Sequence, residues 1–533
     1  MTIVAAPDRA VPTTRRTARW FELSAGAACA AWALLAWLTV IPNQDMLADG
    51  VQVQRLLQDP GVVLAFPGQK HGGVLEYPYL LISEALAPGN TYLHTVLRIG
   101  FAFITGFIVA RLFLRLFPGF PRWAFLAIVV VGPSAIHGIT GPPENPVGVW
   151  WLIANYDLSW LLVSAGALVL VGVRDQVVGR PSAGRAVIAG LLIGLGVYEQ
   201  PTILVLAVPL GVLIHLRQPA TFRRILWIGL GIAIGMIPLA VSYFLYAGVT
   251  TTWDPSHFPV FDPQLARAVL GLDPSVSYET RLLPLALGFT TTPDLASTTV
   301  QAVAVAALLL VCVAVVATGA WRSARTRTWP GPGFAVAVMW LAAAIALVAF
   351  STMLNPIWLY ATGLAVPLWL SVGALPGLVP GHRLGSVLAG AVIVLVAAST
   401  WLHNSYWYSA LPDRITAKAD SMRTQGELAQ ALADSGVTML YGSYYDVIPI
   451  GYASGSRLRF VTSTYNRFRL SDEELLPERL AVAVNTRPTE AWGQEALAAV
   501  QAQCAPNGTV VTHGEFEHRS YTCPRAFFIA VTG

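Results

Sequence analysis

The chain has 533 residues, of which 55% are hydrophobic and only 12% charged, and its mean hydropathy is +0.59. A soluble domain carries about 25% charged residues, so this composition excludes a soluble globular protein and indicates a polytopic membrane protein. The net charge of +4 comes from arginines beside apolar segments, so it gives no reason to predict a nucleic-acid partner.

Apolar segments able to cross a hydrocarbon core of about 30 Å recur along the chain and predict about 11 transmembrane helices. Two of them, 186–198 and 202–216, are short and are separated only by Glu199-Gln200-Pro201. We therefore expect them to form a pair that meets near one interface. The predicted spans are 20–41, 92–114, 123–140, 158–173, 186–198, 202–216, 225–247, 299–320, 334–353, 357–375 and 386–402.

Basic residues predict the orientation, because they attach to alternate connections and cytoplasmic connections carry the excess of Lys and Arg. The N-terminus is therefore expected inside, as a retained anchor with no clear cleavage site, and the C-terminus outside. Lys70 and Lys418 are the only lysines, whereas arginines are many. This bias is typical of GC-rich coding and suggests an actinobacterial source. The arginines that flank the predicted cytoplasmic connections are Arg9, Arg15, Arg16, Arg19, Arg111, Arg115, Arg122, Arg174, Arg180, Arg185, Arg217, Arg223, Arg224, Arg322, Arg325, Arg327 and Arg383.

Hydropathy falls beyond residue 403, which divides the chain into a transmembrane domain, 1–403, and an extracytoplasmic C-terminal domain, 404–533. In the tail, GELAQALADSGV predicts an amphipathic helix, TMLYGSYYDVIPIGYASG a strand and turn, and LRFVTSTY and LAVAVNT further strands. This alternation favours a small α/β domain. Cys504 and Cys523 lie in this outer region, where disulfides persist, and are expected to pair; the alternative is two free thiols.

The long first outer loop, 42–91, gathers carboxylates beside basic side chains. Acidic and basic groups together at the membrane surface suggest chemistry on a phosphate-bearing lipid. The residues concerned are Asp45, Asp49, Lys70, His71, Glu76 and Glu84.

Two stretches are distinctive: 189–216, which has Glu199-Gln200-Pro201 between two short apolar segments, and GQKHGGVLEYPYLL at 68–81. The first resembles the paired short helices, and the second the outer loop, of bacterial GT-C glycosyltransferases, the superfamily related to dolichyl-phosphate-mannose protein mannosyltransferases (family 39). The stretches 228–246 and 359–370 and the tail from Glu427 agree as well. One departure is that the adjacent Asp-Glu pair of many relatives is replaced by Asp45 and Asp49.

The resemblance implies an inverting transferase that takes a sugar from a polyprenyl-phosphate donor. Such a reaction needs a carboxylate base for the acceptor hydroxyl. Asp45, just beyond the first span, is the first choice. The alternative is that Asp45 caps a helix that begins near Met46. Asp49 is the second choice, and it shares a face with Asp45 if 45–58 is helical.

The leaving lipid phosphate calls for cations, and the candidates are Lys70, His71, Arg98 and Arg281. Lys70 and His71 are alternatively solvated loop charges, and Arg98, inside a span, alternatively reaches the interface. Glu76, Glu199 and Asp157 are candidate substrate-binding residues.

The sequence contains no metal-binding motif, so no metal site is predicted, although a divalent cation is compatible with the resemblance. The expected partners are the polyprenyl-phosphate sugar donor, a cell-envelope glycan, lipid or protein acceptor, and membrane lipids. Two other classes stay open. One is a transporter or flippase of lipid-linked sugars. Transporters often have two similar halves with matching broken helices, whereas this sequence has one pair of short helices and no second copy. The other class is a non-catalytic membrane scaffold.

Overall fold

The computed structural model describes residues 15–42, 44–61, 63–64, 73–116, 156–172, 183–217, 221–245, 382–463, 478–489, 491–514 and 516–532, with short stretches and single positions between 122 and 147 and between 303 and 375. These residues form two compact units. The first comprises Met1–Ala36, Arg98–Pro238 and Trp253–Ala410, and the second comprises Trp37–Leu97, Leu239–Thr252 and Leu411–Gly533.

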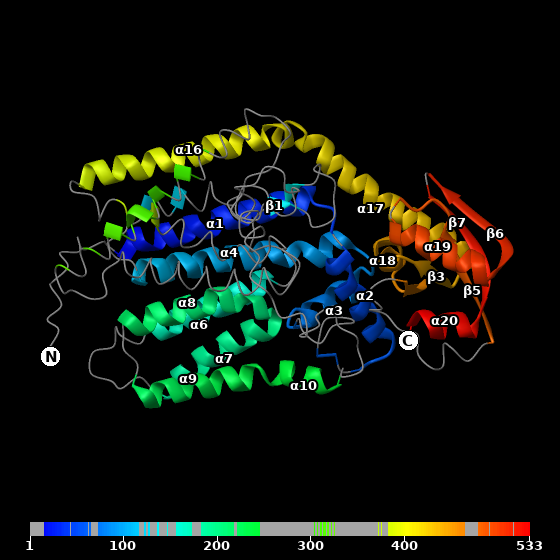
Figure 1. The fold of residues 1–533 in the computed structure, drawn as a ribbon, viewed down its shortest axis with the longest axis horizontal. Helices are drawn as coiled ribbons and strands as arrows, with labels where there is room; N and C mark the ends of the chain where they lie inside the picture. The colour runs from blue at the N-terminus through cyan, green and yellow to red at the C-terminus, as the bar shows by residue number, and fades with distance from the viewer. Residues whose placement is uncertain are drawn as a thin grey trace. The chain divides into compact units, whose positions relative to one another are not determined.

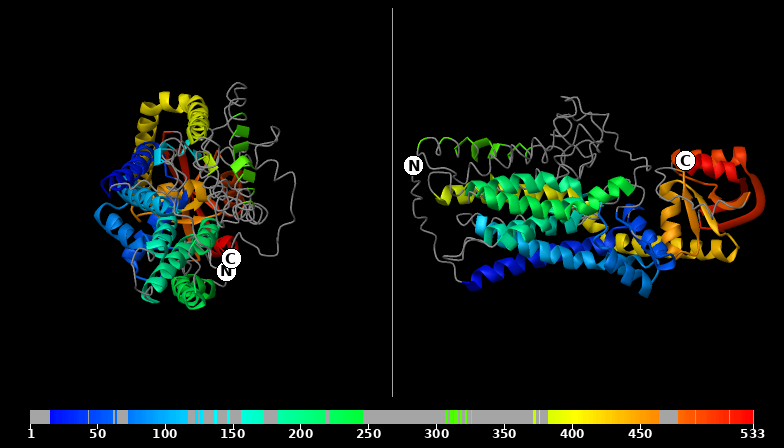
Figure 2. Two further views of the ribbon diagram at one scale, coloured as in Figure 1. Left: turned by 90° about the vertical axis from the view of Figure 1, so that its left-hand side faces the viewer. Right: turned by 90° about the horizontal axis from the view of Figure 1, so that it is seen from below.

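The first unit is built from long apolar helices that lie side by side in Figure 1 and Figure 2. Within the described residues, two helical segments, Thr17–Thr39 and Thr91–Leu116, are long and apolar enough to cross a membrane. The helices that contribute to this unit are α1 (Arg15–Thr39), α4 (Thr91–Leu116), α6 (Tyr156–Gly172), α7 (Ala183–Glu199), α8 (Leu204–Arg217), α9 (Phe222–Gly235) and α16 (His382–Ser409), with a 3₁₀ turn η2 (Pro201–Ile203) between α7 and α8.

Helices α7 and α9 pack backbone to backbone through two glycine pairs of the GxxxG type. A Cβ added at Gly190 would meet the Ile228 carbonyl oxygen at 2.1 Å, and one at Gly231 would meet the Val187 carbonyl oxygen at 2.2 Å. Gly194 and Gly235 face the same contact one turn on. The small residues therefore set how closely the two helices approach.

The helix bounds agree with most of the predicted spans and correct others. The predicted span 225–247 is divided into α9 and α10 (Ile237–Leu245), with the break at Met236 just before Pro238, whose ring cannot continue the helical hydrogen bonds. The predicted helix 123–140 does not reach residue 140, because β1 (Ile136–His137) pairs antiparallel with β2 (Pro146–Val147). The predicted spans 334–353 and 357–375 lie almost wholly outside the described residues, as does most of 299–320.

The second unit contains a five-stranded mixed sheet in the order β4-β3-β5-β7-β6. Strands β3, β4 and β5 are parallel, and β7 runs antiparallel to both β5 and β6. The elements are α17 (Leu411–Asp434), β3 (Met439–Gly442), α18 (Tyr444–Ala453), β4 (Arg459–Thr462), β5 (Arg479–Asn485), α19 (Ala491–Gln503), β6 (Ala505–His513), β7 (Phe516–Pro524) and α20 (Arg525–Thr532).

The two faces of the sheet carry separate hydrophobic clusters, as the period-two alternation of strands requires. Tyr441 and Val484 pack with α19 and α20 on one face. Leu440 and Phe460 point to the other face, where they pack with α17, α18 and Leu47 of the first-loop helix α2 (Gln44–Gln58). The loop helix is therefore part of the same core as the C-terminal residues.

The prediction of a strand and turn over 438–455 is half wrong, because only Met439–Gly442 is a strand and α18 follows at once. Ser443 is the N-cap of α18, and its hydroxyl accepts a hydrogen bond from the backbone N–H of Asp446. This Ser-x-x-Asp spacing is a helix-start signal, which the aromatic and β-branched residues around it obscure. Cys504 and Cys523 are joined by a disulfide, with their Cα atoms 4.4 Å apart.

Candidate functional site around the first-loop helix

Helix α2 begins five residues after α1 ends and carries both predicted base candidates. It starts at Gln44 rather than near Met46, so Asp45 lies inside the first helical turn and not at the cap position. A carboxylate in that turn suits the positive end of the helix dipole. Asp49 lies one turn on, and the i, i+4 spacing places both residues on one face of the helix. The Asp45 side chain lies outside the described atoms.

Asp49 is buried, with 1% of its surface exposed, and its Oδ1 accepts a hydrogen bond of 3.0 Å from the hydroxyl of Tyr77. Tyr77 is the first residue of α3 (Tyr77–Leu86). Asp49 therefore links the two helices of the first loop.

Glu76 lies immediately before α3 and is also buried. Its side chain makes no cap hydrogen bond to the helix; its backbone oxygen accepts from the N–H groups of Tyr79 and Leu80 instead. Pro78 at the start of α3 has no N–H to satisfy, which suits this position.

Of the other predicted site residues, the structure describes some and not others. Arg98 is buried on α4, and Glu199, the last residue of α7, is fully buried just before η2. Asp157 lies in the first turn of α6, and its side chain is outside the described atoms. Lys70, His71 and Arg281 also lie outside the described residues, so the structure does not test whether they join Asp45.

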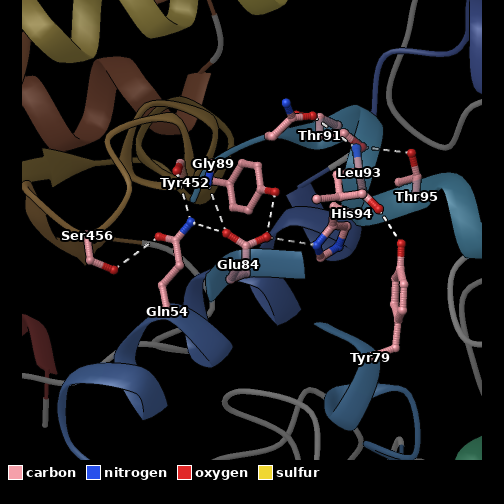
Figure 3. A network of polar contacts seen from close by, with 11 residues as sticks. Gln54, Tyr79, Glu84, Gly89, Thr91, Leu93, His94, Thr95, Tyr452 and Ser456 are labelled. Atoms are coloured by element: carbon pink, nitrogen blue, oxygen red, sulfur yellow. Dashed lines mark hydrogen bonds and ion pairs between the residues drawn. The ribbon is translucent and has the colours of Figure 1, made fainter. Parts of the chain in front are cut away.

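Glu84 on α3 is fully buried and lies at the centre of a network of polar contacts (Figure 3). Its Oε2 accepts hydrogen bonds from Gln54 Nε2 at 2.7 Å and from the Gly89 backbone N–H at 2.9 Å. Its Oε1 accepts from the Tyr452 hydroxyl at 2.8 Å and lies 3.3 Å from His94 Nδ1.

Burial by itself raises the pKa of Glu84, because it removes water from the carboxylate. The hydrogen bonds from His94, Gln54 and Gly89, with the charge of His94, outweigh this effect and hold the pKa below its ordinary value. Glu84 is therefore an ionised acceptor at neutral pH. Burial and the neighbouring charge of Glu84 strongly raise the pKa of the Tyr452 hydroxyl, which stays protonated as a donor.

A second polar contact in this unit is made by Lys418 of α17. Its ammonium donates to the Trp37 carbonyl oxygen near the end of α1 and lies 4.8 Å from the centre of the Tyr92 ring. Burial lowers the pKa of Lys418 to about 8. A cation suits the carbonyl end of a helix, so Lys418 closes the last turn of α1.

Sequence reasoning counted Glu84 among the acids of the loop but gave it no role, and it missed Gln54, His94 and Tyr452. No local signal identifies Tyr452, which lies 368 positions from Glu84 along the chain. Glu84 and His94 lie ten positions apart in the sequence, on either side of a short turn. This spacing alone does not predict a contact, because many acid and histidine pairs at such a distance do not meet. Within the described residues there is no group of three His, Cys, Asp or Glu side chains able to hold a metal ion.

No protein-family model and no curated protein matches the sequence. Solved structures do match. ArnT from Cupriavidus metallidurans bound to undecaprenyl phosphate superposes with a TM-score of 0.51 at 11% identity, over 96% of this chain and 99% of that chain. The apo state of the same protein gives a TM-score of 0.50 at 11% identity, over 97% and 99% of the two chains. An oligosaccharyltransferase from Archaeoglobus fulgidus, tethered to an acceptor peptide, gives 0.42 at 13% identity, over 93% of this chain and 74% of that chain.

Proposed function

We propose that this chain, which has the membrane-helical fold of the GT-C glycosyltransferase superfamily, transfers a sugar from a polyprenyl-phosphate donor to an acceptor on the outer side of the membrane. The observation that carries the proposal is the likeness to ArnT over nearly the full length of both chains, since that protein was crystallised with undecaprenyl phosphate. The acceptor is a glycan, lipid or protein of the cell envelope.

The reaction is a single displacement at the anomeric carbon. The acceptor hydroxyl oxygen forms a bond to that carbon, its proton passes to a carboxylate base, and the bond between the carbon and the phosphate oxygen breaks. The electron pair of the broken bond stays on the polyprenyl phosphate. The product is inverted at the anomeric carbon.

Asp45 is the proposed base. It lies in the first turn of α2, the helix that follows the first span directly. Asp49 is less suited to the role, because its carboxylate is buried and already accepts a hydrogen bond from Tyr77. Asp49 therefore holds α2 against α3.

Cations must stabilise the charge that grows on the leaving phosphate. Lys70, His71, Arg98 and Arg281 are the proposed phosphate partners. Glu76, Glu199 and Asp157 are proposed to bind sugar or acceptor hydroxyls.

The test uses purified full-length protein in lipid nanodiscs with a panel of polyprenyl-phosphate sugars and an envelope extract as acceptor, and measures released polyprenyl phosphate. Wild-type protein should release it, and Asp45→Asn should reduce the rate about a thousandfold while the protein stays folded. Asp49→Asn should reduce the rate less. Full activity in Asp45→Asn would reject Asp45 as the base. In a parallel experiment in sealed proteoliposomes, intact donor that crosses the bilayer without release of polyprenyl phosphate would indicate a flippase instead.

A further inference from the structure

The Glu84 carboxylate joins four other segments of the second unit, and one of its partners, Tyr452, lies 368 positions away in sequence (Figure 3). Gln54 reaches it from α2, Tyr452 from α18, and His94 from the start of α4. The backbone N–H of Gly89 reaches it from the turn between α3 and α4. One buried acid on α3 therefore orients three other elements.

Gln54 extends this network and fixes α2 against the C-terminal residues. Its Nε2 also donates to the backbone oxygen of Tyr452 at 3.2 Å, and its Oε1 accepts from the Ser456 hydroxyl at 3.1 Å. The amide is thus held in one orientation by groups on both sides. The rotation of α2 about its own axis is set at this position.

Helix α2 packs closely against the side chains of the network. The rings of His94 and Tyr452 meet edge to face, with centroids 5.5 Å apart. A Cβ added at Gly50 of α2 would lie 2.4 Å from the Tyr452 ring and 3.0 Å from His94. Only a glycine lets the helix come this close.

A buried charge is an energetically unfavourable means of holding helices together. Removing a carboxylate from water is energetically unfavourable, and apolar residues of similar volume often stabilise a fold as well or better. What a fully satisfied polar network adds is one defined geometry, because its directional bonds disfavour the alternative packings that apolar contacts tolerate. The arrangement of Glu84 suits precise placement rather than extra stability.

We infer that Glu84 is a positioning residue for glycosyl transfer, which fixes α2 against α18 and so holds Asp45 at the reacting sugar. The inference rests on the proposed function. It assigns the C-terminal residues a part in the reaction although they supply no reacting group: Tyr452 of α18 acts through Glu84 and Gln54 on the helix that carries the base.

The test compares Glu84→Gln, Tyr452→Phe and the double variant with wild-type protein in nanodiscs. Glu84→Gln should lower kcat about a hundredfold, because displacement of a reacting group by about 1 Å has an effect of that size. Tyr452→Phe should lower it less. The KM for donor should change little, because neither side chain is proposed to touch the donor. If both residues act through one network, the double variant should be no slower than Glu84→Gln alone.

A matched control removes another tyrosine hydroxyl from the same unit. Tyr441 of β3 is buried on the opposite face of the sheet, against Phe527. Tyr441→Phe should keep the wild-type kcat. Equal losses in Tyr441→Phe and Tyr452→Phe would overturn the inference, since they would show a general loss of fold.

Amide hydrogen exchange over residues 44–58 gives a second readout that does not need turnover. It should rise in Glu84→Gln and Tyr452→Phe but not in Tyr441→Phe. Active wild-type protein with equally active variants, or unchanged exchange in α2, would overturn the positioning role. A wild-type protein that releases no polyprenyl phosphate would overturn the proposed function, and the exchange measurement would still decide whether Glu84 holds α2.

Discussion

At the scale of single residues, two acids of the first loop are held in place by hydrogen bonds from tyrosine hydroxyls. Asp49 and Glu84 are both buried acids with tyrosine donors, Tyr77 and Tyr452. The carboxylate oxygens of both residues accept hydrogen bonds from groups of the protein. Asp45, at the start of the same helix, is the acid of α2 that we assign to proton transfer.

Gly50 tests how tightly α2 is fitted. Gly50→Ala should destabilise the protein by about 1–3 kcal/mol, because its Cβ would overlap the Tyr452 ring and force α18 or α2 to move. Thermal unfolding of the purified protein measures the change. Gly426→Ala on α17 is the matched control: its Cβ would meet nothing within 4 Å, so better helix propensity should leave stability unchanged or raise it slightly.

His518 of β7 makes the protein sensitive to acid. Burial lowers the pKa of His518 to about 4, below the ordinary value of 6.5, and no hydrogen-bond partner is present for Nδ1. The unfolded chain therefore binds a proton that the folded chain does not between about pH 6.5 and about pH 4. Stability from this group is complete above pH 6.5 and falls by up to about 3 kcal/mol as the pH drops to 4.

The measurement is the unfolding temperature of the full-length protein across this pH range. His518→Gln should flatten the pH dependence over this range. The loss of stability at still lower pH, where carboxylates such as Glu84 become protonated, should remain. An unchanged slope in His518→Gln would contradict the assignment.

At the scale of elements, glycine spacing explains the closest helix pair of the first unit. The GxxxG pairs at Gly190 and Gly194 on α7 and at Gly231 and Gly235 on α9 face each other. In a bilayer the hydrophobic effect does not drive helices together, because the lipid tails are as apolar as the side chains. Glycine pairs stabilise the contact instead, because they let the two backbones pack closely.

Gly231→Ala should therefore weaken the α7 and α9 contact by about 1–3 kcal/mol, since the new methyl group would overlap the Val187 carbonyl oxygen. Gly229→Ala, on the same helix but facing open space, should have no such effect. The two variants are compared by thermal unfolding in the same detergent. Equal unfolding temperatures for both would show that this contact contributes little.

At the scale of the whole molecule, the alternating arginines predict a cytoplasmic N-terminus and an outer C-terminus. Alkaline phosphatase is active only outside the cytoplasm, so a fusion after Gly533 should be active and a fusion after Ala220, next to Arg217, Arg223 and Arg224, should be inactive. Both fusions are compared with matched protein levels. The reverse pattern would invert the proposed topology and place the first loop away from lipid-linked sugars.

The sequence by itself determined the membrane class, the approximate bounds of α1, α4, α6, α7 and α8, and the strands β3, β4 and β5, because hydropathy and alternation act over a few residues. The helix predicted from Gly426 begins earlier, at Leu411. The family resemblance led to the fold that the likeness to ArnT supports. The helix α18 was missed, although Ser443 and Asp446 carried its start signal.

Only the tertiary structure decided how α2 is held. Glu84 meets Tyr452 across 368 positions of sequence, and Gln54 meets the Tyr452 carbonyl oxygen across 398. No pattern of local spacing encodes such contacts, because they depend on which faces of α2, α3 and α18 are brought together when their apolar sides form one core. The sequence identified the acids of the first loop, and the packing decided which of them are held by the protein.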